Sequence, residues 1–355
     1  MDLEPLIREL SNYYDKDSQN TFVSVYFNKQ DDAKFLEKRE STCSSLLSKE
    51  EADFFNQTME IINEVLKKEK GKTIAVFASS KHDLLRSVTL PLSLHNSLVV
   101  DTSPYIRPLA RIQDEYEDYT LIVLDSHQAR IYTISLGSIE HEKRLSEDIM
   151  NKHKKGGWSQ QRFARLRKGA IQDFYKEVIE HIDTHETEQI VLAGPGTAKQ
   201  HFSEQLPKHL QEKIIASFDV DIDDEEQVLS SSLSKMKDYE QQEADDLVQR
   251  IKAEVLTDGL GVYGLEETLA AAQQGKIDVL VIEKDYKLKG CVCEHCQLIK
   301  SGPIKDCPIC GGPTSEADVI EEIIEFAERT GATIEFTKHD ELHNLGHIGA
   351  LLRFK

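Results

Sequence analysis

Residues 156–167 read GGWSQQRFARLR and set the interpretation of the whole chain. The adjacent glycines Gly156 and Gly157 give the backbone conformations that other residues avoid, and they allow it to approach a ligand closely. Trp158, the only Trp of the chain, follows them. Arg162 and Arg165 are three residues apart, which places them on one face of a helix. The stretch therefore predicts a glycine hinge that leads into a basic helix.

The region around this stretch carries only positive charge. No Asp or Glu occurs between Ile149 and Gln172, although the 355-residue chain has a formal net charge of -20. A chain this acidic is not expected to bind phosphates over its whole surface, because phosphate binding needs clustered Lys and Arg. The alternative is a solvated basic helix after a glycine turn. The candidates for RNA contact are Lys152, His153, Lys154, Lys155, Gly156, Gly157, Trp158, Arg162, Arg165 and Lys168.

Length and composition indicate a globular protein with more than one core. A chain of 355 residues favours two or three domains, and 39% hydrophobic with 30% charged residues is typical of soluble proteins. The N-terminus lacks the apolar core of a signal peptide, and the longest apolar runs, such as residues 190–193, are too short to span a bilayer. We expect a cytoplasmic monomer that does not bind membranes.

Residues 1–220 predict two α/β domains, residues 1–115 and residues 116–220, and the second contains the basic stretch. In the first, the pattern gives strands at residues 21–27, 73–78 and 97–100 and a helix at 49–70. In the second, it gives a hairpin at residues 119–134, a helix from about residue 159 with Phe163, Leu166, Ala170, Phe174 and Val178 on one face, and strands at 189–193 and 214–220.

Residues 221–355 predict a third α/β domain that carries a cysteine-rich insertion. The acidic run at residues 219–226 is interpreted as a solvated linker or helix start. The pattern after it gives a long polar helix at about residues 225–256, a helix at 265–274, a strand at 279–282, a helix at 317–330 and a strand at 333–337. The fold class is therefore α/β, with three mixed α/β domains.

Four of the six cysteines have the spacing of metal ligands. Cys293-x-x-Cys296 and Cys307-x-x-Cys310 are separated by ten residues, which predicts a zinc ribbon over residues 291–312. Four thiolates close a tetrahedral shell, so the Zn²⁺ is expected to be structural. Cys291 and His295 are alternative ligands that the regular spacing disfavours.

Two other patterns are discounted as sites. Gly194-x-Gly196-x-x-Lys199 fits neither the dinucleotide nor the Walker phosphate loop and is interpreted as a strand-to-helix turn. His339, His343 and His347 are spaced by four residues, but Gly346 and the strand pattern after it argue against a helical metal site.

The basic stretch resembles the GGQ loop of archaeo-eukaryotic class I peptide chain release factors and the related Pelota proteins. In that signature Gly-Gly-Gln-Ser is followed two residues later by Arg-Phe-x-Arg-Leu-Arg. Residues 191–194, 264–269 and 346–354 resemble the family's central-domain strand, third domain and C-terminal strand, so the resemblance covers residues 119–355. In the loop the matching positions are Gly156, Gly157, Ser159, Arg162, Phe163, Arg165, Leu166 and Arg167.

The resemblance implies a three-domain release-factor-like architecture with a zinc-bearing insertion in the third domain. It also implies a protein that enters the ribosomal A site, with this loop near the peptidyl transferase centre and P-site tRNA. In the family, the loop's Gln helps position water and stabilise the oxyanion during ester hydrolysis. Trp158 occupies that position here. Its indole donates one hydrogen bond and accepts none, and it is suited to stacking on a base.

Two departures from the family separate three hypotheses. Besides the missing Gln, neither of the family's stop-codon motifs is present, and residues 40–45 read ESTCSS. We therefore expect a non-hydrolytic A-site factor of ribosome rescue or hibernation, similar to Pelota-like or Balon-like factors. A translational GTPase such as elongation factor Tu or its archaeal counterpart is the implied partner. The alternatives are a codon-independent peptidyl-tRNA hydrolase that uses Gln160 or Gln161, and an RNA-binding adaptor that never enters the ribosome.

Overall fold

The computed structural model describes residues 3–15, 20–29, 34–148, 158–182, 187–293, 295–296 and 298–355, with only the backbone described at residues 158–160 and 315. The chain divides into two compact units. The first unit contains residues 1–115 and 243–355, and the second contains residues 116–242. No helix among the described residues combines the length and the apolar composition needed to cross a membrane.

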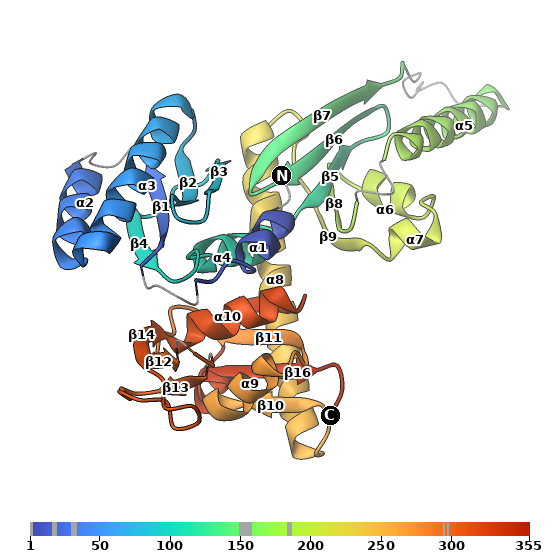
Figure 1. The fold of residues 1–355 in the computed structure, drawn as a ribbon. Coiled ribbons are helices and arrows are strands. Elements are labelled where there is room, and N and C mark those ends of the chain that lie inside the picture. The colour runs from blue at the N-terminus through green and yellow to red at the C-terminus, as the bar shows by residue number, and fades with distance from the viewer. Residues whose placement is uncertain are drawn as a thin grey trace. The chain divides into compact units, whose positions relative to one another are not determined.

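The N-terminal part of the first unit is an antiparallel sheet covered by two helices (Figure 1). The strands lie in the order β3 (Leu84–Leu90), β2 (Thr73–Ser79), β1 (Phe22–Asn28) and β4 (Ser97–Asp101). Helices α2 (Lys34–Leu46) and α3 (Lys49–Lys68) pack on it through a core that includes Phe55, Met59 and Ile62. Ser48 and Glu51 form a capping box that starts α3. The predicted strands and the helix of this segment are confirmed, whereas α2 and β3 had not been predicted.

The C-terminal part of the first unit is a mixed sheet with apolar residues on both faces. Its order is β10 (Gly261–Tyr263), β16 (Ile348–Leu352), β11 (Ile277–Glu283) and β15 (Thr333–Thr337), with only β11 and β15 parallel. Helices α9 (Gly264–Gln273) and α10 (Val319–Arg329) pack on one face. The end of α8 (Glu225–Leu256) and α11 (Asp340–Asn344) pack on the other, through Val248, Ile251 and Leu342.

A small antiparallel sheet is inserted between β11 and α10. Its strands are β13 (Ile299–Ser301), β12 (Lys289–Cys293) and β14 (Thr314–Asp318), in that order. Gly290 in β12 faces Lys300 and Val319 so closely that an added Cβ would lie 2.3 Å from each of them. The absence of a side chain at Gly290 therefore allows the insertion to pack closely against the start of α10.

Helices α1 (Glu4–Leu10) and α4 (Arg107–Glu115) join the N-terminal segment to the C-terminal sheet within the first unit. Ala110 of α4 is part of the core under β11 and β15. The Arg107 guanidinium donates to the Tyr286 carbonyl at 2.6 Å, and the Phe336 N–H donates to Asp114 at 3.1 Å. The Ser103 hydroxyl donates to the buried carboxyl of Glu325 at 2.6 Å. A chain segment that the sequence pattern left without a helix therefore holds these two parts together.

The buried carboxyl groups of α10 make the stability of the first unit depend on pH. Burial raises the pKa of Glu321 and of Glu322 to about 8, and it raises the pKa of Glu325 well above its usual value. These groups bind protons more tightly in the folded chain than in the unfolded chain. The stabilising contribution of Glu321 and Glu322 is therefore complete below the ordinary Glu pKa of 4.5 and is lost as the pH rises through about 8. The contribution of Glu325 is likewise lost at alkaline pH.

Replacing Glu325 by Gln is expected to make the first unit less sensitive to alkaline pH. The amide keeps the shape of the acid and can accept from Ser103, but it cannot ionise. We expect the free energy of unfolding to rise by about 1–3 kcal/mol at about pH 9 and to change little at about pH 5. Denaturant titrations of both proteins at the two pH values measure this, and an equal effect at both would contradict it.

The second unit is a five-stranded sheet with a core on each face. The order is β7 (Ser138–Ser146), β6 (Gln128–Ser135), β5 (Tyr119–Leu124), β8 (Ile190–Ala193) and β9 (Ile214–Phe218), antiparallel as far as β5 and parallel beyond it. Side chains alternate between the two cores, with Ile122 and Leu192 on one face and Leu121 and Val191 on the other. The first core is covered by α5 (Trp158–Glu180), α6 (Ala198–Ser203) and α7 (Lys208–Gln211), and the second by the start of α8.

Most predicted elements of the second and third domains are confirmed. The hairpin, the long basic helix, the parallel strands and the polar helix from Glu225 to Leu256 all form. The strand β7 had not been predicted, because its exposed, charged sequence lacks strand-like alternation. The mixed α/β class is confirmed, and the division into domains at residues 115 and 220 stays a prediction.

Candidate RNA-contact surface and cysteine cluster

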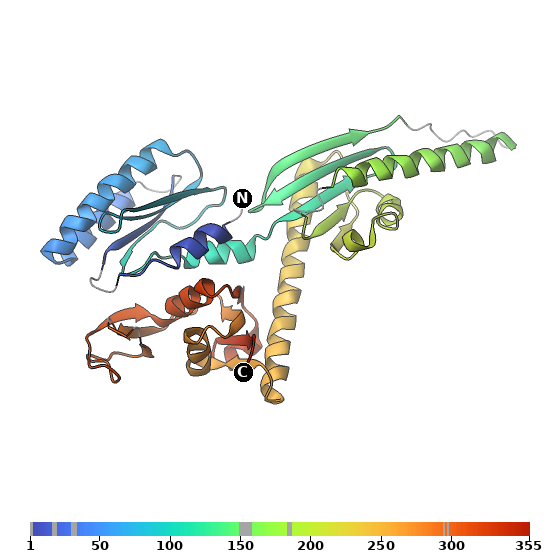
Figure 2. The same cartoon turned by 45° about the vertical axis from the view of Figure 1, so that its right-hand side comes forward.

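Helix α5 has a buried half and an exposed half. Phe174, Tyr175 and Val178 are buried in the core of the second unit. Phe163 and Leu166, which the sequence placed on the same apolar face, are 41% and 57% exposed. Figure 2 shows the reason, because the N-terminal half of α5 extends past the strands of its sheet. The expected apolar face is therefore present, but its first part lies outside the core.

Three predicted RNA-contact residues lie on this exposed half. Arg162, Arg165 and Lys168 are all exposed. Successive intervals of three residues on a helix keep their side chains within about a third of its circumference. The Arg165 guanidinium donates to the carbonyl of Gln161 at 3.5 Å. Within the described part of the chain, none of the three forms an ion pair with a carboxylate. Their charge is therefore available to an anionic ligand.

Most of the other predicted RNA-contact residues lie outside the part of the chain that the structure describes. Lys152, His153, Lys154, Lys155, Gly156 and Gly157 lie outside the described residues. Trp158 is the first residue of α5, and Gln160 belongs to its first turn, in both cases with only the backbone described. Gln161 is an exposed residue of the same helix. The two glutamines proposed as catalytic candidates are therefore helical residues.

The four ribbon cysteines converge on one point at the end of the small sheet. The sulfur atoms of Cys293, Cys296, Cys307 and Cys310 all lie within 4.8 Å of one another. The Sγ atoms of Cys293 and Cys310 are 3.4 Å apart, and those of Cys296 and Cys307 are 3.5 Å apart. A tetrahedral ion with Zn–S bonds of about 2.3 Å needs sulfur atoms about 3.8 Å apart. The cluster has the size and donor set of a structural zinc site.

Backbone N–H groups favour thiolates in this cluster. The N–H of Cys296 points at the Cys293 sulfur at 3.5 Å, and that of Ile309 points at the Cys307 sulfur at the same distance. The N–H of Cys310, followed by that of Ile309, contributes to lowering the pKa of Cys307 to about 6. Cys291 is buried in β12 and lies outside the group of four. The ring of His295 packs on Gly312 and is also outside it.

The turn after β8 contains no free cation. Lys199 is 7% exposed, and its ammonium donates to the carbonyls of Gly194 and Gly196 and to Asp219. The ammonium that would reach a phosphate in a phosphate loop is therefore already bound by protein oxygens. The interpretation of residues 194–199 as a strand-to-helix turn is confirmed.

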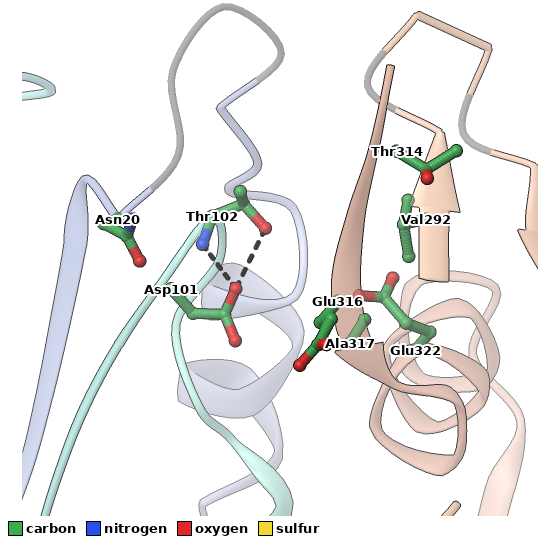
Figure 3. Close-up of a pocket in the computed structure, with 8 residues that line it drawn as sticks. All are labelled: Asn20, Asp101, Thr102, Val292, Thr314, Glu316, Ala317 and Glu322. Carbon is green, nitrogen blue, oxygen red and sulfur yellow. Dashed lines mark hydrogen bonds between the residues drawn. The ribbon is translucent and has the colours of Figure 1, made fainter. Parts of the chain in front are cut away.

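A polar pocket lies between the end of β4 and β14 in the first unit (Figure 3). Its volume is about 360 Å³, and its carboxylates belong to Asp101, Glu316 and Glu322. Asp101 accepts hydrogen bonds from the N–H and the hydroxyl of Thr102, at 2.7 and 3.2 Å. None of the predicted site residues lines this pocket, and its acidic character makes it unsuitable for RNA.

Comparison with known proteins gives matches along most of the chain. Residues 104–236 match the family model described as bacterial archaeo-eukaryotic release factor family 10, and residues 241–355 match the model described as eRF1 domain 3. Peptide chain release factor subunit 1 of Archaeoglobus fulgidus is 34% identical over 287 residues, which are 72% of this chain and 70% of that protein. The Methanococcoides burtonii protein of the same name is 27% identical over 289 residues, with the same coverage.

The solved structures that match this chain include a translation termination-like factor of S. cerevisiae, Dom34. It is 12% identical, and the match covers 99% of this chain and 91% of that one with a TM-score of 0.43. An archaeal translation termination factor matches over 99% of this chain and 97% of its own, at 15% identity and a TM-score of 0.29.

Proposed function

The chain belongs to the archaeo-eukaryotic release factor and Pelota superfamily, and from this premise we propose that it occupies the ribosomal A site without hydrolysing peptidyl-tRNA. The observation that carries the proposal is the exposed half of α5. Among the described residues, its exposed cations Arg162, Arg165 and Lys168 form no ion pair. They follow the Gly156-Gly157-Trp158 sequence in a segment without a carboxylate. Such a projecting basic helix is suited to the phosphates of ribosomal RNA and of tRNA.

The residue types at the loop argue against catalysis. Hydrolysis of the ester needs a compact polar group aimed at the oxyanion and the attacking water. Trp158 offers one indole N–H and a large aromatic face instead. An aromatic face stacks on unpaired bases, and each such contact contributes about 1–3 kcal/mol to binding. We therefore propose that the loop anchors the protein on the ribosome and does not promote peptide release.

The alternative function, hydrolysis by a displaced glutamine, requires a change in α5. Gln160 and Gln161 are helical, and either one would reach the position of the family's glutamine only if the first turn of α5 unwound. That turn contains no acidic residue that would interact favourably with the helix dipole. The displaced-glutamine mechanism therefore remains the second candidate, and the release assay described in the Discussion separates it from the first.

The remaining roles follow from the proposed occupancy. A factor that neither reads stop codons nor releases peptide would act on stalled or idle ribosomes in the cytoplasm, in rescue or in hibernation. Residues 40–45, which stand where the family reads codons, belong to the helix α2. Delivery by a translational GTPase is proposed from the family alone. The four cysteines are proposed to hold one structural Zn²⁺ that shapes the inserted sheet.

Ribosome binding should be visible in the fluorescence of the only tryptophan. Trp158 stands at the start of α5 beside the three cations, so docking on RNA is expected to change its emission. We expect the protein to co-sediment with ribosomes and the emission to change in proportion to the bound fraction. Free tRNA at the same concentration is the control. Binding to RNA without sedimentation with ribosomes would instead favour the third hypothesis, an adaptor that never enters the ribosome.

A further inference from the structure

A second group of side chains that could hold a metal ion lies outside the cysteine cluster. One ligand atom each from Glu283, His343 and His347 lies within 4.8 Å of the other two. Glu283 ends β11, His343 lies in α11 and His347 precedes β16. β11 and β16 are neighbouring strands, so the sheet fixes the positions of Glu283 and His347 (Figure 1).

Both imidazoles turn the same nitrogen toward one carboxylate oxygen. The Nδ1 atom of His343 is 3.3 Å from Oε2 of Glu283, and the Nδ1 atom of His347 contacts the same oxygen. The two rings meet edge to face with centroids 4.3 Å apart. Zinc bonds of about 2.0–2.2 Å to nitrogen and oxygen place tetrahedral ligand atoms about 3.3 Å apart. The His343 and Glu283 atoms therefore already have the spacing that an ion requires. All three ligand atoms lie within 4.8 Å of one another, so His347 needs only a small side-chain shift to join them.

The backbone at His347 is held in a conformation that disfavours a side chain. Its φ is 70°, in the left-handed region where glycine is the usual residue. Non-glycine residues in this region are strained, and such residues cluster at functional sites. Tyr286 stacks on the ring with centroids 4.5 Å apart and planes inclined by 19°, which fixes the ring's orientation. The backbone conformation sets the position of His347, and the stacking on Tyr286 orients its imidazole beside Glu283.

The site differs from the helical three-histidine pattern that the sequence argued against. His339 lies at the N-cap of α11, where its Nδ1 accepts from the N–H of Glu341 at 3.1 Å. Its other ring nitrogen is 3.8 Å from Asp245. The helical site is therefore not formed, and Glu283, sixty residues before His343, takes the third position.

We propose that Glu283, His343 and His347 bind a divalent transition-metal ion such as Zn²⁺. Two imidazoles and one carboxylate are a common set for such ions, and three protein ligands leave at least one coordination position for water or for a partner's side chain. The His343 side chain is 62% exposed, which gives an ion access from solvent. This site is independent of the cysteine cluster and of the proposed role on the ribosome.

Co²⁺ titration of the full chain, with Zn²⁺ already bound by the cysteines, tests the proposal. We expect one further equivalent to bind, with a visible spectrum that lacks the thiolate charge-transfer band. His343→Gln is expected to weaken this binding at least tenfold, because it removes an exposed ligand without disturbing the core. His127→Gln is the matched control, since His127 is also exposed and pairs with one carboxylate, Asp125, at 3.3 Å.

Three results of the Co²⁺ titration would contradict the proposed metal site. No uptake beyond the cysteine site would overturn the proposal and leave Glu283 as a hydrogen-bond acceptor of two imidazoles. Uptake accompanied by a thiolate band would also overturn it, because the ion would then have entered the cysteine cluster. Equal affinity in His343→Gln and His127→Gln would show non-specific binding.

Discussion

Replacing Arg162, Arg165 and Lys168 together by Glu is expected to abolish co-sedimentation with ribosomes at physiological salt. Each lost phosphate contact lowers the slope of log affinity against log salt by about 0.7–0.9, so three contacts remove about 2–3 from that slope. Reversal of the charge adds repulsion to the loss of attraction. We therefore expect the affinity to fall by about a thousandfold or more. All three side chains are exposed, so the fold should remain intact.

A matched variant separates this effect from the net charge. Lys176, Lys208 and Lys237 are exposed residues of the same unit that lie away from the start of α5. Their replacement by Glu makes the same change in total charge. We expect it to weaken binding by less than about tenfold, through the general electrostatic field. If both triple variants lost binding equally, the exposed half of α5 would not be the contact surface.

Removing the proposed Zn²⁺ is expected to have the largest effect on stability. The sheet formed by β12, β13 and β14 is small, and Cys293 and Cys307 are among its few buried side chains. Apparent zinc-binding free energies in small ribbon-like modules are about 10–16 kcal/mol. We therefore expect Cys307→Ser to lose the bound Zn²⁺ and the order of residues 289–318. Hydrogen exchange with mass spectrometry measures this segment against the rest of the chain.

Cys291→Ser is the control for the zinc prediction. Cys291 is buried in the same strand, β12, but its sulfur is not among the four that converge. We expect it to keep one Zn²⁺ per chain and to lose only the packing of a small side chain. Retention of Zn²⁺ by Cys307→Ser would refute the assignment of the cluster as a zinc site.

Local patterns predicted the elements of this protein well. The helix from Glu225 to Leu256 and the strand from Thr333 to Thr337 have the predicted bounds, because long periodic or β-branched runs specify their own structure. The cysteine spacing placed four sulfur atoms together because a ribbon is closed by residues near one another in sequence. Helices, strands and the cysteine cluster depend on residues close together in the sequence, so they could be predicted from it.

Contacts between segments far apart in the sequence could not be predicted from local patterns. The periodicity of Phe163 and Leu166 continues into Phe174, but it does not reveal that the sheet ends beneath the middle of α5. Helix α4 packs against β15, more than two hundred residues away, through Asp114 and Ala110. The spacing of His339, His343 and His347 was discounted as a helical metal site, and no local spacing indicates that Glu283 lies beside the last two. Each of these features depends on tertiary packing.

Binding to the ribosomal A site without hydrolysis of peptidyl-tRNA can be tested in a single experiment. Ribosomes with labelled peptidyl-tRNA in the P site are incubated with saturating protein, and bound protein and released peptide are measured in the same sample. We expect full binding with peptide release at the background rate, and the same result for Gln160→Ala and Gln161→Ala. Release above background by the original chain that disappears in either glutamine variant would contradict it and establish the hydrolase.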